Sequence, residues 1–181
     1  MKKTMMMMVL ALVLLVTFAA GALACAELDF TQRNFYGGQT LPVYRGPGVE
    51  YGRGANGWAK ASTDEALYAA GKENGWALVM YGTGEGKTRV GWVDLDQFKY
   101  NTKILKLDDL HFAYSNATIT SDCTLTDDPV LASCELAVMT AGTRVTYLCS
   151  YYKYRSWAYI ETWVEGRPIR AFVPMDCLQV N

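Results

Sequence analysis

The chain has 181 residues, of which 17 are lysine or arginine and 18 are aspartate or glutamate, giving a formal net charge of −1. No basic run follows the N-terminus, and because nucleic-acid binding needs a basic face that releases counterions, the composition argues against that function. The 16 glycines, 12 tyrosines and 5 tryptophans favour strands and tight turns over helices.

The first 24 residues form a predicted signal peptide. Two lysines give a positive start, the apolar stretch 5–20 follows, and alanines at positions 22 and 24 fit the site that a signal peptidase cuts. A membrane anchor, the alternative, needs ~20 apolar residues, and this stretch ends earlier. We expect residues 1–24 to be removed, which leaves 15 basic and 18 acidic residues and a net charge of −3 on an exported protein.

Cys25 follows the expected cleavage site and leaves two interpretations open. Residues 22–25 resemble the lipobox of bacterial lipoproteins, in which the cysteine is acylated and becomes the first residue. A plain secretory cut explains the same residues. The protein is therefore expected to be secreted or associated with the cell envelope, with Cys25 as the candidate for lipidation.

Short strands and turns follow in chain order. Asn74-Gly75 is a hairpin signal, and alternating residues after it fit a strand that is packed on both sides. No segment after the signal has a helical apolar period with caps. Strands are predicted at residues 40–44, 66–69, 76–81 and 88–93, with a glycine-rich loop at 52–57. Short strands at regular spacing indicate a small barrel.

The chain repeats itself at an offset of about 80 residues. Four ordered matches carry the repeat: Leu28-Asp29-Phe30 with Leu110-His111-Phe112 and 46–47 with 128–129 at 82, 76–79 with 157–160 at 81, and 91–96 with 171–176 at 80. An ordered series of this kind predicts two copies of one unit, a first domain at 28–100 and a second at 116–181.

Residues 101–115 connect the two predicted domains. This segment contains five large apolar residues, namely Ile104, Leu105, Leu107, Leu110 and Phe112. A free linker would be more polar, so we expect the connector to pack between or onto the domains.

The strand pair around Trp76 and Trp92 carries a resemblance to a known family. Residues 75–81, a glycine-bearing turn and Val90-Gly91-Trp92-Val93 resemble the bacterial SH3 (SH3b) domain, in which such motifs lie on adjacent antiparallel strands. Residues 156–161 and 171–173 are similar in the second copy, and residues 174–178 resemble the one-turn helix before the last SH3 strand. The resemblance implies an all-β fold of two small SH3-like barrels in tandem.

The same resemblance implies a non-catalytic binding module outside the cytoplasm. Its expected partner is a cell-envelope polymer, peptidoglycan above all, or a peptide. The alternative is a structural protein that docks on another exported protein through a sheet edge or the Pro174 surface. No nucleic acid is expected as a partner, and a membrane only through the signal segment or a lipid anchor.

Four further cysteines lie in the C-terminal half, at Cys123, Cys134, Cys149 and Cys177. An even number in an exported protein predicts two disulfides, and the sequence does not choose among three pairings. Zinc is the competing interpretation, but no C-x-x-C spacing is present. We expect neither a metal nor a cofactor.

No catalytic set is visible in the sequence. His111, the single histidine, occupies a repeat position where the other copy has Asp29. A nucleophilic Cys–His pair needs a thiol that is not in a disulfide. Acid pairs at 94/96 and 127/128 are of the kind that a hydrolase uses, but turn acids that bind backbone amides are the simpler interpretation. We therefore expect no enzyme.

Two aromatic surfaces are the candidate binding sites. In the first copy aromatic residues and an arginine flank the glycine-rich loop, and the alternative is that Trp58 covers an open barrel end. In the second copy tyrosines interleave with cations, which suits stacking on sugars, and the alternative is cross-strand packing. The candidate ligand-binding residues are Tyr51, Arg53, Trp58, Tyr151, Tyr152 and Tyr154.

Overall fold

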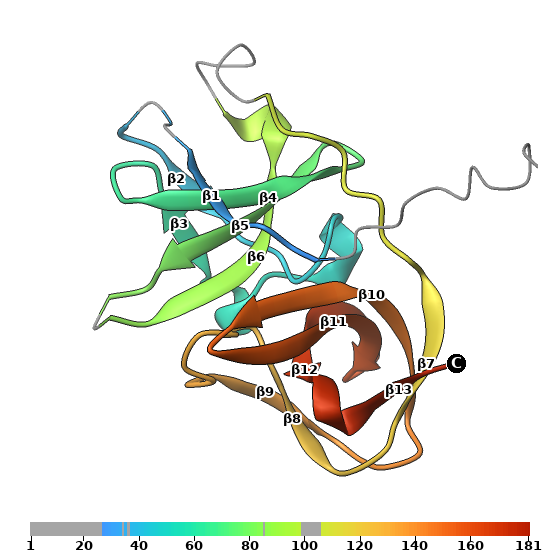
Figure 1. Cartoon of the computed structure of the whole chain (residues 1–181). Helices are drawn as coiled ribbons and strands as arrows, with labels where there is room; N and C mark the ends of the chain where they lie inside the picture. The colour runs from blue at the N-terminus through green and yellow to red at the C-terminus, as the bar shows by residue number, and fades with distance from the viewer. Residues whose placement is uncertain (1–26, 34, 36, 85, 99–105) are drawn as a thin grey trace, which may run out of the picture.

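The computed structural model describes residues 27–33, 35, 37–84, 86–98 and 106–181 (Figure 1). Within these residues the protein is all-β, as the sequence predicts, with thirteen strands and four single-turn 3₁₀ helices. None of the helices in the described ranges is long and apolar enough to cross a membrane. The predicted signal peptide and Cys25 lie outside the described residues.

Figure 1 shows two stacked halves, the first in blue to green and the second in yellow to red. The first half contains β1 (Thr31–Arg33), β2 (Thr40–Pro42), η1 (Val49–Tyr51), η2 (Ala55–Gly57), β3 (Lys60–Ser62), β4 (Leu67–Glu73), β5 (Trp76–Gly82), β6 (Thr88–Asp94) and η3 (Leu95–Gln97). The second half contains β7 (Ser115–Ile119), β8 (Cys123–Thr126), β9 (Glu135–Met139), β10 (Arg144–Lys153), β11 (Arg155–Val164), β12 (Arg167–Pro174), η4 (Met175–Cys177) and β13 (Leu178–Val180).

The strands form three antiparallel sheets. Their orders are β1-β4-β5-β6 and β2-β3 in the first half, and β13-β7-β10-β11-β12-β8-β9 in the second half. The Asn74-Gly75 turn joins β4 to β5 with both residues at positive φ, as a two-residue hairpin requires. The predicted central strands are therefore present, with β4 extending further than expected.

The register of the central hairpins reproduces the sequence repeat. Leu78 lies opposite Trp92 across β5 and β6, and Tyr159 lies opposite Phe172 across β11 and β12. These residues are the partners that the offsets of 81 and 80 predict. Equivalent residues therefore occupy equivalent places in the two sheets.

A β-bulge also recurs in the two halves. The register shifts between Ala69 and Gly71 in β4, and between Tyr147 and Cys149 in β10. An extra residue at a bulge bends its strand and increases the local twist. Each sheet can therefore curl around its own core.

Each sheet nevertheless remains open along its hydrogen-bonded order in the described residues. In the first half, Tyr44 bridges to β6 by donating its N–H to the Trp92 carbonyl at 2.8 Å and accepting the Trp92 N–H at 2.9 Å. In the second half, β12 contacts β8 through the single pair Phe172 and Thr126. In the part of the chain that the structure describes, the end strands of the four-stranded sheet and those of the seven-stranded sheet are not paired with each other, so the closed two-barrel arrangement stays a prediction.

Three clusters of buried side chains make up the interior. One lies in the first half around Val79 and Val93, and one in the second half around Ile160 and Val173. The third, which we call the central cluster, draws residues from both halves. It consists of Leu28, Leu78, Met80, Val90, Trp92, Phe112, Leu148, Cys149, Tyr151, Trp157, Tyr159 and Phe172.

Strand alternation explains how one strand serves two clusters. Successive side chains of a strand point to opposite faces, so β5 directs Ala77 and Val79 into the first-half core and Leu78 into the central cluster. In β11, Ile160 faces the second-half core and Tyr159 the central cluster. The nearly continuous apolar runs of these strands follow from burial on both faces.

The described part of the connector packs against both halves. Leu107 lies in the first-half core, and Phe112 lies in the central cluster. Backbone hydrogen bonds fix this path, from Lys72 N–H to Asp108 O at 2.9 Å and from Ala113 N–H to Leu148 O at 2.8 Å. Ile104 and Leu105 lie outside the described residues.

Candidate functional site

A groove of about 450 Å³ lies where the two halves meet. Its volume is in the range of small-molecule and short-chain binding sites, roughly 300–1,000 Å³. Four aromatic residues and two residues of opposite charge are among its lining residues, namely Phe30, Tyr68, Tyr81, Tyr151, Glu65 and Lys153. Strands β4, β5 and β6 of the first half and β10 of the second contribute to it.

Tyr68 is the exposed aromatic ring of the groove. It lies between buried Leu67 and Ala69 on β4, so the alternation of the strand turns its ring outward, and 37 % of the residue is exposed. Its ladder partner on β5 is Met80, which also lines the groove. A rigid strand therefore presents this ring to the solvent.

Tyr151 is a second aromatic residue that lines the groove. Its ring meets Phe30 edge to face, with centroids 5.4 Å apart, and packs on Phe172 at 5.9 Å. Burial, with the nearby charges of Asp29 and Glu27, raises the pKa of the Tyr151 hydroxyl. The hydroxyl therefore stays protonated and is able to donate a hydrogen bond.

A second hollow continues from the groove. It shares Phe30, Tyr151 and Lys153 with the groove and adds Tyr152 and Asp29. At the tip of the β10–β11 hairpin, the neighbouring Tyr154 is exposed, and Lys153 Nζ lies 5.6 Å from the centre of its ring. The predicted tyrosine surface of the second copy thus adjoins the groove.

The predicted site residues of the first copy lie elsewhere. Tyr51 donates its hydroxyl hydrogen bond to Glu161 Oε2 at 2.7 Å, and Arg53 Nη2 donates to the Ala59 carbonyl at 2.9 Å. Trp58 is 77 % exposed, which does not fit a cover over a barrel end. The structure does not bring these three residues into the groove.

Arg170 is the centre of a buried polar cluster between the halves. Its Nε donates to Glu161 Oε2 at 2.7 Å, its Nη1 pairs with Glu73, and its Nη2 donates to the Tyr114 hydroxyl at 3.2 Å. The side chain is 4 % exposed. Burial opposes the charge, but the hydrogen bonds to both carboxylates raise the pKa of Arg170 above its usual value. Because Glu73 comes from β4 and Glu161 from β11, this cluster joins the halves.

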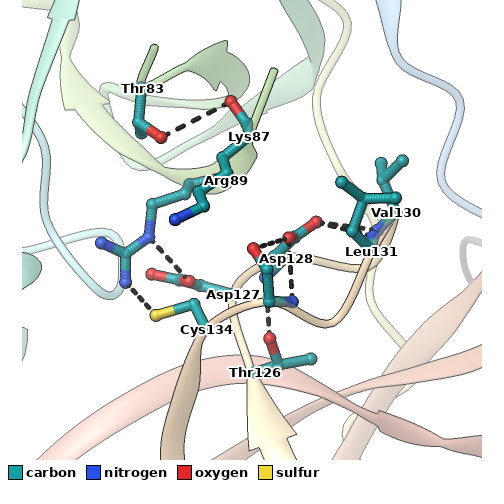
Figure 2. A network of polar contacts seen from close by, with 10 residues as sticks. Thr83, Lys87, Arg89, Thr126, Asp127, Asp128, Val130, Leu131 and Cys134 are labelled. Atoms are coloured by element: carbon teal, nitrogen blue, oxygen red, sulfur yellow. Dashed lines mark hydrogen bonds and ion pairs between the residues drawn. The ribbon is translucent and has the colours of Figure 1, made fainter. Parts of the chain in front are cut away.

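Figure 2 shows a second polar network at the junction. Arg89 of β6 donates from Nε to Asp127 Oδ1 at 2.9 Å and from Nη2 to the Cys134 sulfur. Burial raises the pKa of Asp127, although Arg89 opposes this shift. Burial and the charge of Asp127 raise the pKa of the Cys134 thiol. A protonated thiol is a poor nucleophile, so Cys134 has no activated character.

Asp128, the other acid of this pair, binds loop backbone. Its carboxylate accepts the amides of Val130, Leu131 and Ser133 at 3.0–3.1 Å, and the Ser133 hydroxyl at 2.6 Å. Both acids of the 127/128 pair therefore have structural partners, as turn acids do.

The four described cysteines are present as free thiols, so the two predicted disulfides stay a prediction. Cys149 lies within the central cluster, whereas Cys134 faces Arg89, so these two lie in different surroundings. Cys123 and Cys177 line one hollow of the second half. The described residues also contain no cluster of three side chains that could hold a metal ion.

Sequence reasoning missed part of the groove. Glu65 was not singled out, and Phe30 was noted only as a member of the Leu-x-Phe repeat. Tyr68 had a usable signal, since an aromatic between two small or apolar strand residues points away from their core. The meeting of Phe30 with Tyr151 depends on long-range packing, which no local pattern reports.

No known family model matches the chain, and no curated protein matches it. Among solved structures, NlpC2 and NlpC1 from Trichomonas vaginalis are similar, with TM-scores of 0.32 and 0.33 and 17 % identity in both cases. The matches cover 85 % and 87 % of this chain and 49 % of each of those chains, so it spans about half their length. The class that the structure itself defines is an all-β protein with two similar halves around a shared aromatic cluster.

Proposed function

We propose that the protein is a non-catalytic binding module that works outside the cytoplasm, secreted or anchored at the cell envelope. Its ligand is a strand of envelope polymer, with peptidoglycan as the class that the SH3b resemblance implies. The observation that carries the proposal is the groove, where Phe30, Tyr68 and Tyr151 gather from both halves.

The chemistry of the groove suits a glycan that carries peptides. Aromatic faces stack on the apolar C–H faces of sugar rings, and tyrosine hydroxyls add hydrogen bonds. Exposed Glu65 and Lys153 provide one acceptor and one cation for the amino and carboxylate groups of a short peptide. A ligand with both kinds of group uses the whole groove.

The partners of the polar side chains support a binding role over a hydrolytic one. Asp127 and Asp128 are bound to Arg89 and to loop amides, and a catalytic carboxylate must reach its substrate. His111 is exposed and does not line the groove. No step of bond cleavage is assigned to any of these residues.

Sedimentation with purified peptidoglycan tests the proposal. The protein should pellet with the polymer, and Tyr68→Ala should weaken binding roughly 3–10-fold, because it removes one stacking ring. The control is Trp163→Ala, which removes another exposed aromatic, on β11, outside the residues that line the groove. A protein that stays in the supernatant, or an equal loss in both variants, would contradict the proposal.

Docking on another exported protein is a second candidate. Strand β9 ends the order of the seven-stranded sheet and exposes Val138, and an edge of this kind is able to accept a strand from a partner. A stable protein partner that co-purifies with the native chain, and is lost on Val138→Pro, would favour this function over polymer binding.

A further inference from the structure

Two cysteines of the second half come from opposite sides of its seven-stranded sheet. Cys123 is the first residue of β8 and Cys177 is the last of η4, directly before β13. In the sheet order, β13 lies at one end and β8 is second from the other. The two cysteines nevertheless line the same hollow, and the backbone of Thr120, three residues before Cys123, hydrogen-bonds to the Cys177 carbonyl.

The electrostatic environment of Cys123 is consistent with a nearby Cys177. Burial raises the pKa of its thiol to about 12, and the neighbouring Cys177 adds to the shift. The backbone fixes the position of Cys177, whose carbonyl accepts the Thr120 N–H at 2.9 Å. Strand β13 then pairs with β7, opposite Ile119 and Thr118.

In the first half, the positions equivalent to Cys123 and Cys177 are not cysteines. By the repeat offsets of 82 and 80, the counterparts of the two cysteines are Leu41 and Gln97, and these residues line a common hollow. The contact between the segments there is the Gln39 side chain, which donates from Nε2 to the Gln97 carbonyl at 3.5 Å. A long hydrogen bond thus occupies the position that two thiols occupy in the second half.

The other two cysteines have different roles. Cys149 is fully buried in the central cluster. Cys134 accepts a hydrogen bond from Arg89 and lies beside Asp127. Neither lines the hollow that contains Cys123 and Cys177.

We propose that Cys123 and Cys177 form a disulfide under oxidising conditions, and that this bond closes the seven-stranded sheet covalently. This pairing goes beyond the sequence, which leaves three pairings open and predicts two bonds. It assigns one bond and leaves Cys134 and Cys149 out of it.

The reaction is thiol–disulfide exchange with a small disulfide such as oxidised glutathione. The thiolate of one cysteine attacks a glutathione sulfur, which forms a mixed disulfide and releases one glutathione. The second cysteine then attacks the mixed disulfide, forms the Cys123–Cys177 bond and releases the other glutathione. The two cysteines lose two electrons and two protons in total, and one glutathione disulfide becomes two thiols.

Peptide mapping of the full chain tests the pairing directly. The reduced protein is oxidised with glutathione disulfide, its remaining thiols are alkylated, and it is cleaved on the N-terminal side of aspartate. Cys123 then lies in peptide 122–126, Cys177 in peptide 176–181, Cys134 and Cys149 in peptide 128–175, and Cys25 in peptide 1–28. Mass spectrometry without reduction should find 122–126 linked to 176–181 and an alkylated 128–175.

Two cysteine variants separate this bond from others. Cys177→Ser should abolish the linked species, whereas Cys134→Ser should leave it unchanged. Oxidation of the wild-type protein should raise its Tm by roughly 10 °C, since the bond closes a long loop, and should not raise that of Cys177→Ser. The proposal is overturned if 122–126 and 176–181 stay unlinked at equilibrium with oxidised glutathione, or if either links to 128–175.

Discussion

The two halves share one strand register but hold their sheet edges differently. In the second half, a single seven-stranded sheet includes every strand, and β10 and β11 each run for ten residues. In the first half, the strands are divided between a four-stranded sheet and the β2–β3 pair, and Tyr44 bridges to β6. The repeat therefore preserves the central hairpins, while the edges have diverged.

The difference has a physical cause in where each strand buries its side chains. The central strands serve both their own core and the central cluster, so a change there affects two packed surfaces at once. Edge strands bury one face at most and tolerate replacement. Around equivalent positions of the repeat, the second half has two cysteines and the first half has the hydrogen bond between Gln39 and Gln97.

The largest expected effect comes from the shared central cluster. Trp92 is fully buried there, and its Nε1 donates to the Tyr159 hydroxyl at 2.8 Å. Trp92→Ala should lower the free energy of unfolding by about 4 kcal/mol, through the cavity and the lost hydrogen bond. Urea unfolding measures the loss, and hydrogen exchange should show reduced protection in both halves.

Reduced amide protection in only one half would contradict a central cluster that both halves share. If Trp92→Ala reduces amide protection in β4–β6 and leaves β10–β12 unchanged, then the halves fold independently and the central cluster is not shared. The control is Trp163→Ala, which changes an exposed ring and should cost less than about 0.5 kcal/mol.

The next effect concerns the charge cluster that joins the halves. Arg170→Met leaves Glu73 and Glu161 without their buried cation, which should cost about 3 kcal/mol of unfolding free energy. The matched control is Lys72→Met, because Lys72 forms an exposed pair with Asp109 at 3.7 Å and should matter by less than about 1 kcal/mol. Similar losses of unfolding free energy for Arg170→Met and Lys72→Met in urea would contradict a buried charge cluster that connects the two halves.

The smallest effect is a pH dependence in the loop after β8. Burial works to raise the pKa of Asp128, but its hydrogen bonds to loop amides and Ser133 outweigh it and lower the pKa below 3.8. Asp128 therefore stabilises the fold above pH 3.8, and this contribution is lost as the pH falls through its folded pKa. Asp128→Asn should cost about 2 kcal/mol at neutral pH.

Unfolding free energies measured across acidic pH test both the size and the sign of the contributions of Asp128 and Asp127. The difference between wild type and Asp128→Asn should shrink as the pH falls. For Asp127, whose pKa is raised by burial, the sign reverses, so the advantage of wild type over Asp127→Asn should decrease as the pH rises from 3.8 through the folded pKa. Parallel profiles for the two variants would contradict these assignments.

Local sequence features predicted the central part of the fold. The Asn74-Gly75 turn and the strand packed on both faces at β5 are present. The repeat offsets also predicted which residues lie opposite each other. These features depend on residues that are close in sequence or on a comparison of the two repeat copies, and a single sequence provides both.

The groove and the thiol pair were not predictable in the same way. Phe30 meets Tyr151, and Cys123 and Cys177 come to line one hollow, only after the halves pack and the sheet curls. An even cysteine count suggested two bonds, but it carries no information on which sulfurs come together. Tyr51 and Arg53 lie outside the groove and form hydrogen bonds within the fold, so their predicted role in ligand binding stays a prediction.

The most direct test of the account is NMR titration of the protein with a soluble disaccharide-peptide fragment of peptidoglycan. The account predicts saturable shifts at Phe30, Tyr68 and Tyr151, from both halves at once, and weaker binding by Tyr68→Ala. Shifts confined to the loop around Trp58 in one half, or no shifts at millimolar fragment, would contradict it.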